Sequence, residues 1–237
     1  MSFKTTPELW GDALDRARHQ WRRLRREPVD LPPPPPRPVA FTIAFSRQEG
    51  ARGTEVAQEV ARQLDWVYYD RGLLEKIAEE ANLRSELLES VDERYSNWLT
   101  DIFESLAGRR ALSGTYYEHL VKVLYSVAAH GQCVILGRGA TFLLPMESTL
   151  RVRLVAPFKD RAARAASRAN LSPADAAAQV ESLDRQRDQF VQNYCQKDAA
   201  DAAHYDLVLN TSRYGNTDCA QLVIDAQRRL QAAAVNA

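Results

Sequence analysis

The sequence has few of the residues that build disulfide frameworks, metal centres and histidine-based active sites. It contains three cysteines and four histidines in 237 residues. Cys133, Cys195 and Cys219 are widely spaced and form no CxxC pair, so neither a cysteine zinc site nor a disulfide framework is indicated, and reduced thiols are expected. The histidines and acids show no metal-ligand spacing, and no GxSxG segment occurs, which argues against histidine-based hydrolysis.

Long apolar runs and an excess of one charge are also lacking. No run approaches the roughly 20 apolar residues of a membrane helix, and residues 1–27 are too rich in arginine for a secretory signal. Because 31 Lys and Arg balance 31 Asp and Glu, the chain as a whole has no field that attracts nucleic acid or an anionic membrane. A cytoplasmic globular protein is expected, and 45% hydrophobic residues suffice for its core.

Proline is concentrated near the N-terminus. Eight of the eleven prolines precede residue 39, and the unbroken run Pro32–Pro36 predicts a stiff polyproline II spacer. We therefore expect an N-terminal segment over residues 1–38, one domain over 39–232 and a short tail over 233–237. Since the run prevents continuous secondary structure across it, we expect the domain to fold without the first 38 residues.

The segment before the prolines has the pattern of an amphipathic helix. Thr6-Pro7-Glu8 is a typical helix start, with a capping hydroxyl, a proline and an early acid. An apolar stripe follows at helical spacing, opposite an arginine-rich face, and consists of Trp10, Leu14, Ala17, Trp21 and Leu24. The stripe is expected to dock on the main domain or on a second copy of it, so residues 7–26 are a candidate partner surface. Contact with a membrane surface or nucleic acid is the alternative.

From residue 39 on, short β-rich runs alternate with long helical patterns, which is typical of an α/β fold with a parallel sheet. Five runs are near-continuously apolar, as strands buried on both faces are: Val39–Ser46, Trp66–Tyr69, Gln132–Gly137, Leu150–Ala156 and Tyr205–Thr211. A helical insertion separates the second and third, with the pattern Leu88, Val91, Tyr95, Trp98, Ile102 and Leu106, then Tyr117–Ala129. Ser172-Pro173 predicts a further helix start.

The segment after the first strand is a candidate phosphate loop. Ligands of open α/β sheets bind beyond the carboxyl ends of the strands, and residues 46–54 (SRQEGARGT) lead there into a predicted helix over Glu55–Leu64. The segment does not match GxxxxGK[ST], because Gly53 stands directly before Thr54 where lysine is required, and Arg47 and Arg52 occupy glycine positions. An ordinary strand-to-helix turn is the alternative.

Two other strand ends carry charged side chains. Asp70 and Arg71 follow the second strand, and Arg138 lies between two glycines after the third. Each alone is compatible with a surface ion pair. Because the carboxyl ends of parallel strands share one edge of the sheet, together they indicate an anion site.

Arginines form a stripe after the fourth strand. Arg161, Arg164 and Arg168 share one face of a predicted helix, where three like charges repel unless an anion lies among them. A solvated helix face is the alternative. Arg185 and Lys197 continue the basic character further along the chain.

These segments, in this order, resemble the cytidylate kinase-like family of P-loop nucleoside monophosphate kinases. The similar stretches are residues 42–57, 68–83, 133–144, 150–164 and 205–215. The resemblance implies a three-layer P-loop kinase fold with a five-stranded parallel sheet, a helical insert that binds the nucleoside monophosphate, and a lid.

The resemblance also implies roles for individual residues. The donor ATP would be held by Arg47, Gly50, Ala51, Arg52, Gly53 and Thr54, with Thr54 as the Mg²⁺ ligand. The acceptor nucleotide would face Asp70, Arg71, Arg138, Arg185 and Lys197. Catalytic charge would come from Arg52, Arg161, Arg164 and Arg168, because phosphoryl transfer requires mainly positioning and positive charge around the moving group.

The expected activity is transfer of the ATP γ-phosphoryl group to a nucleoside monophosphate such as CMP. Since residues 46–54 contain no lysine, arginine must supply the charge that a loop lysine would give. One alternative is a catalytically weak or inactive nucleotide-binding sensor that acts through its N-terminal helix. Another is a structural homodimer.

Overall fold

The computed structural model describes residues 6–24, 41–89 and 115–235, and the structural statements below concern these residues. The predicted proline spacer and the helical pattern from Val91 to Leu106 lie outside them. Among the described residues, no helix is both long and apolar enough to cross a membrane.

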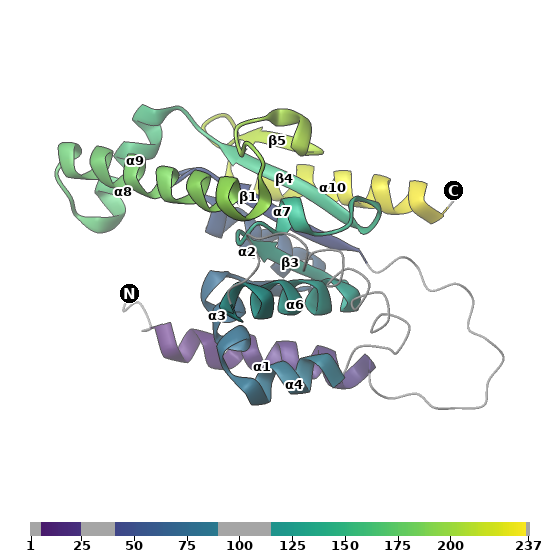
Figure 1. Cartoon of the computed structure of the whole chain (residues 1–237). Coiled ribbons are helices and arrows are strands. Elements are labelled where there is room, and N and C mark those ends of the chain that lie inside the picture. The colour runs from purple at the N-terminus through teal and green to yellow at the C-terminus, as the bar shows by residue number, and fades with distance from the viewer. Residues whose placement is uncertain (1–5, 25–40, 90–114, 236–237) are drawn as a thin grey trace, which may run out of the picture.

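A five-stranded sheet, parallel throughout, forms the centre of the molecule (Figure 1). Its strands are β1 (Thr42–Arg47), β2 (Val67–Tyr69), β3 (Cys133–Leu136), β4 (Thr149–Val155) and β5 (Leu207–Asn210). The order is β2-β3-β1-β4-β5, with Phe45 of β1 in register with Leu136 of β3 and Val152 of β4. The five predicted strands are confirmed, and their carboxyl ends share one edge.

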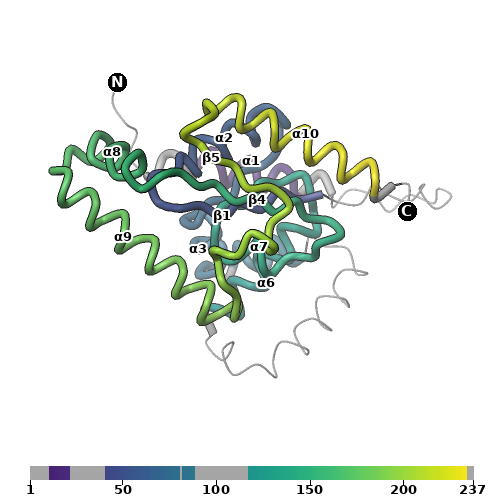
Figure 2. Tube along the Cα trace, turned by 90° about the horizontal axis from the view of Figure 1, so that it is seen from above, coloured from purple at the N-terminus to yellow at the C-terminus, as the bar shows by residue number. Residues whose placement is uncertain are grey.

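Helices cover both faces of the sheet (Figures 1 and 2). One face is covered by α2 (Gly53–Leu64) and α10 (Asn216–Val235), and the other by α3 (Arg71–Glu79), α6 (Thr115–His130) and α7 (Ala140–Leu143). Side chains alternate along β1: Ile43 and Phe45 are buried toward α2 and α10, and Ala44 packs in the opposite core. The result is three layers, and α10 extends to Val235, so the predicted tail begins as helix.

Two helices project from the body in both views. They are α8 (Phe158–Ala169) and α9 (Pro173–Phe190), which pack against each other through Ala165, Ala176 and Val180. The predicted start at Ser172 is confirmed, since its hydroxyl accepts a hydrogen bond from the Asp175 N–H at 3.2 Å. The pair begins where β4 ends, so it lies beside the edge at which ligands are expected. Short helical turns complete the chain at Met146–Ser148, Val191–Cys195 and Ala202–His204.

The N-terminal helix α1 (Thr6–Leu24) docks on the main domain, which is one of the two docking sites predicted for its apolar stripe. It packs against β2, α3 and α6, and Ala17 and Trp21 are buried in the same core as Tyr69. Trp21 Nε1 donates to Tyr69 Oη at 3.2 Å, and Arg18 pairs with Glu86 of α4 (Ala81–Glu89) at 3.1 Å.

This docking gives a physical reason against the expectation that the domain folds without the first 38 residues, which stays a prediction. A proline run interrupts secondary structure, but it does not keep a helix on one side from packing on the domain at the other. Removing α1 would expose the apolar surface that Trp21 covers and leave Tyr69 Oη without its donor. The boundary at residue 38 stays a prediction.

Candidate functional site

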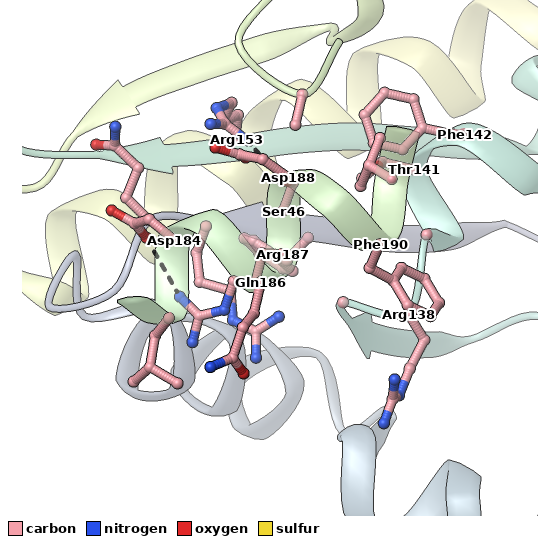
Figure 3. Close-up of a pocket in the computed structure, with 18 of the residues that line it drawn as sticks. Ser46, Arg138, Thr141, Phe142, Arg153, Asp184, Gln186, Arg187, Asp188 and Phe190 are labelled. Carbon is pink, nitrogen blue, oxygen red and sulfur yellow. Dashed lines mark hydrogen bonds and ion pairs between the residues drawn. The ribbon is translucent and has the colours of Figure 1, made fainter. Parts of the chain in front are cut away.

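A cavity of about 420 Å³ opens at the carboxyl edge of the sheet (Figure 3). It lies between the ends of β1 and β3 and the helix α9, and it is more strongly charged than an ordinary pocket. Its charged side chains are Arg47, Arg71, Arg138, Arg153, Arg187, Asp184 and Asp188. Phe142 and Phe190 add aromatic surface. Five arginines against two aspartates make this cavity suited to an anion that also has an apolar part.

The turn after β3 forms one wall of the cavity with a left-handed backbone. Gly137, Arg138 and Gly139 have φ values of 86°, 51° and 73°. A Cβ on Gly137 would collide with the Arg47 side chain, and a Cβ on Gly139 would lie 2.9 Å from Cys195 Sγ. The two glycines therefore make room for side-chain atoms of Arg47 and Cys195. Arg138 tolerates a positive φ that few side chains adopt.

Arg138 lines the cavity and is held in place from two sides. Its guanidinium forms an ion pair with Glu75 and lies 5.4 Å from the centre of the Phe190 ring. Glu75 also pairs with Arg71 at 3.0 Å. Burial, with a smaller contribution from the nearby charge of Arg71, lowers the pKa of Arg138 to about 10, and the group remains a cation at neutral pH.

Arg153 is a cavity residue that sequence analysis missed. It lies in the middle of β4, and its Nη1 donates to Ser46 Oγ at 2.9 Å and to Tyr205 Oη at 3.2 Å. The signal was present, because Arg153 is a charged residue inside the otherwise apolar stretch LRVRLVA. A buried cation in a central strand requires polar partners.

The loop after β1 leads into an uncapped helix N-terminus. Arg52 adopts a left-handed conformation (φ 54°) at the N-cap of α2, and no side chain caps the first turn. The first N–H groups of a helix have no partner within it, so those of Gly53 and Thr54 are available to an oxyanion. The Thr54 side chain is exposed there. Among the described residues, no three His, Cys, Asp or Glu side chains are grouped so that they could hold a metal ion.

The arginine stripe of α8 holds the loop itself. Arg161 donates to the carbonyl oxygens of Ala156 at 3.0 Å and Glu49 at 3.1 Å, and it pairs with Asp184. Arg164 donates to the Gly50 carbonyl at 3.1 Å and also binds the Thr211 carbonyl and the Ser212 hydroxyl. Arg161 and Arg164 were expected to face phosphates, whereas in the structure they bind oxygen atoms of the chain.

Glu49 is the central acid of this arrangement and was not singled out from the sequence. Its buried carboxylate pairs with Arg168 through one oxygen and with Arg187 through the other. Burial alone would raise the pKa of Glu49, but the hydrogen bonds and charges of Arg168 and Arg187 outweigh it and lower the pKa. Of the arginine stripe on α8, Arg168 is therefore paired with Glu49, while Arg161 is paired with Asp184.

The remaining predicted residues lie apart from the cavity. Asp70 caps α3 by accepting from the Leu73 N–H at 2.8 Å, and it does not line the cavity. Arg185 and Lys197 are exposed and do not line it either, whereas Arg187, two residues along α9, does. Of the five predicted acceptor residues, the structure brings Arg71 and Arg138 to the cavity. Gly50, Ala51, Arg52 and Gly53 stay on the neighbouring loop.

A parallel sheet flanked by helices, with an arginine-lined cavity at the carboxyl edge of its strands, defines an α/β protein with a candidate anion site at that edge. The model of the cytidylate kinase-like family matches residues 42–213. The chain therefore belongs to the cytidylate kinase-like family.

Known proteins show more distant similarity. A cytidylate kinase from Halobacterium salinarum is 28% identical over 144 residues, which cover 56% of this chain and 75% of that protein. A uronate isomerase from Corynebacterium glutamicum is 26% identical over 187 residues, and the match spans 75% of this chain and about a third (35%) of that protein. The solved structure of an uncharacterized protein from Eubacterium ventriosum superposes with a TM-score of 0.64 at 18% identity, over 80% of this chain and 99% of that one, which shows the fold alone.

Proposed function

We propose that this protein transfers the γ-phosphoryl group of ATP to a nucleoside monophosphate, with CMP as the first candidate. The observation that carries the proposal is that two candidate anion sites adjoin each other, namely the N-terminus of α2 and the arginine-lined cavity. Ser46 and Arg47 at the end of β1 and Gln48 at the start of the loop that leads to the N-terminus of α2 also line the arginine cavity. A donor phosphate at the helix end and an acceptor phosphate in the cavity would meet across this loop.

The residues present fit a magnesium–triphosphate donor. The uncapped N–H groups of Gly53 and Thr54 suit the donor phosphates, and the exposed Thr54 hydroxyl suits the magnesium ion. When bound, the ion neutralises charge on the donor oxygens. Arg52 at the N-cap adds a side-chain cation beside the donor phosphates.

The cavity supports an acceptor with one charged and one flat end. Arg47, Arg138 and Arg187 suit a phosphate, and Phe142 and Phe190 suit a nucleobase. Asp188 also lines the cavity, and burial raises its pKa. As a hydrogen-bond acceptor it suits a sugar hydroxyl or an exocyclic amino group. CMP has each of these features.

A phosphoryl-transfer assay tests the proposal. The full chain is incubated with ATP, Mg²⁺ and each nucleoside monophosphate in turn, and diphosphate formation is measured. Activity with CMP, lost in Arg138→Met and retained in Arg62→Met, is expected. Arg62 is a matched control because it lies on the exposed side of α2 and pairs with Glu59 alone. Absence of diphosphate product with every acceptor would contradict the proposal.

A nucleotide-binding sensor without turnover is the second candidate, and one observation favours it. Trp21 of α1 donates to Tyr69, the last residue of β2, and Arg71 of the cavity follows two residues later. A ligand in the cavity would thus be linked through one short strand to the N-terminal helix. CMP binding without turnover, together with a change in Trp21 fluorescence, would favour the sensor.

A further inference from the structure

Arg47 occupies a position that two separate loops are built to accommodate. It is the last residue of β1, and its side chain runs between Gly53 at the start of α2 and Gly137 after β3. A Cβ on Gly53 would lie 2.6 Å from Arg47 Cγ, and a Cβ on Gly137 would collide with Arg47 Nη1. Any side chain at either glycine would displace the guanidinium, so its place between the donor loop and the acceptor turn is defined by packing.

The guanidinium of Arg47 has no partner. It makes no hydrogen bond and no ion pair with any residue that the structure describes, although it is partly buried and lines the cavity. Burial is the main cause that lowers the pKa of Arg47 to about 10, and the positive charge of Arg187 is the second. Tyr68 and Glu49 raise the pKa by smaller amounts. A buried cation without a partner is costly unless an anion binds it.

Arg187 presents a second unused donor to the same cavity. Its Nη2 binds Glu49, whereas Nη1 is buried and has no hydrogen-bond partner. The nearest carboxylate oxygen, Asp184 Oδ1, is 3.7 Å from Nη1, which is too long for a hydrogen bond. Figure 3 shows Arg187 among the residues that line the cavity. Two neighbouring guanidinium groups thus have N–H donors without acceptors.

We propose that Arg47, together with Nη1 of Arg187, binds the phosphate group of the acceptor. A phosphate has several acceptor oxygens and two negative charges, so it matches the guanidinium of Arg47 and the free Nη1 donor of Arg187. That the phosphate belongs to a nucleoside monophosphate rests on the proposed function, whereas the phosphate site itself rests on the geometry of these two arginines. In this arrangement Arg47, rather than Arg52, supplies the cation between the donor and acceptor sites.

Arg47→Met is the variant that tests the assignment, because methionine keeps much of the length and removes the charge. Calorimetric titrations with CMP, with cytidine and with inorganic phosphate are compared for the wild type, Arg47→Met and the control Arg62→Met. Charge-assisted hydrogen bonds to phosphate correspond to roughly ten- to hundredfold in affinity. We expect a loss of that size for CMP and phosphate in Arg47→Met, no change in Arg62→Met, and cytidine binding that is equally weak in all three.

Thermal unfolding without ligand separates this role from a structural one. Removing an unpaired buried charge should leave the melting temperature of Arg47→Met equal to or above that of the wild type. A lower melting temperature combined with unchanged CMP affinity would overturn the assignment. If Arg47→Met does not fold, Arg47→Lys replaces it: CMP affinity at least threefold weaker supports the assignment, and equal affinity overturns it.

The outcomes for this site and for the proposed activity are distinguishable. Arg47-dependent binding of CMP and phosphate without phosphoryl transfer would leave the site standing and contradict the kinase activity. Transfer to CMP, with the same CMP affinity in the wild type and in Arg47→Met, would support the kinase activity and overturn the assignment of Arg47 to the phosphate site.

Discussion

Two groups of arginines lie at the same edge of the sheet, and they differ in what binds them. On the loop side, Arg161, Arg164 and Arg168 are all bound by oxygen atoms of the chain itself. In the cavity, Arg47 and one nitrogen of Arg187 have no partner in the part of the chain that the structure describes. The first group fastens the α8–α9 pair to the loop, and the second is the candidate for a ligand. The number of arginines at this edge therefore does not distinguish those that hold the chain together from those that are candidates to bind a ligand.

The comparison predicts opposite responses to mutation. Removing a bound arginine should cost stability because a buried acceptor loses its donor, whereas removing the unbound Arg47 should cost ligand affinity. The variants below either break this distinction or make it sharper.

Trp21→Ala is expected to have the largest effect, and it serves as a reference that touches neither group. Trp21 is fully buried between α1 and the domain, and truncating a buried tryptophan costs about 3–5 kcal/mol of unfolding free energy. Denaturant unfolding at neutral pH measures the loss, and CMP affinity of the remaining folded protein should be unchanged. A stability close to that of the wild type would mean that α1 does not dock in solution.

Arg161→Met should destabilise the protein by about 3 kcal/mol, because it leaves Asp184 Oδ2 and the Glu49 carbonyl without the donor that Arg161 supplies. The same unfolding experiment measures it, with Arg62→Met as an exposed control of unchanged stability. If Arg161→Met is as stable as the wild type but loses nucleotide affinity, the loop-side group is a ligand site after all.

Glu49→Gln should cost about 1–3 kcal/mol at neutral pH, because Arg168 and Arg187 lose their charged partner. The folded-state pKa of Glu49 is lowered, so its stabilising effect is present above the unfolded pKa of about 4.3 and is lost as the pH falls through the folded value. Unfolding curves of the wild type and Glu49→Gln should therefore differ at pH 7 and converge in acid. A difference that stays constant with pH would show that the carboxylate charge is not involved.

Arg138→Ala should have the smallest effect on stability, about 1 kcal/mol, since it removes one ion pair with Glu75 and a contact with the Phe190 ring. CMP affinity should fall roughly tenfold. Glu75→Gln is the matched control, because it weakens the same ion pair and keeps the guanidinium in the cavity. Equal losses of affinity in both variants would assign the effect to the position of the turn rather than to the Arg138 charge.

The sequence was sufficient for the layers of the fold but not for the pairing of charges. Apolar runs at strand length predicted all five strands, and the rule that ligands bind at carboxyl ends placed Arg47, Arg71 and Arg138 at the correct edge. The regular spacing of Arg161, Arg164 and Arg168 predicted an anion among them. Spacing along one helix carries no information on the partners, and here Arg161 pairs with Asp184, and Arg168 pairs with Glu49, more than 100 residues earlier in the chain.

The same limit explains the residues that were missed or misplaced. Arg187 and Arg185 are equally basic and two positions apart, and only the packing of α9 on the loop decides which one enters the cavity. Asp70 was predicted to contact the acceptor because it follows a strand. In the structure its carboxylate instead caps α3 by accepting from the Leu73 N–H. The proline run suggested an independent N-terminal segment, and the burial of Trp21 became evident only from the fold.

The most direct measurement of the central claim compares CMP with cytidine. The claim is that the cavity is an anion site because Arg47 and one nitrogen of Arg187 have no partner among the described residues, so the phosphate of the ligand should dominate binding. The thermal unfolding of the wild-type chain is followed at fixed ionic strength with increasing CMP or cytidine. A melting temperature that rises with CMP and stays constant with cytidine is predicted, and equal shifts for both ligands, or a shift with neither, would contradict the account.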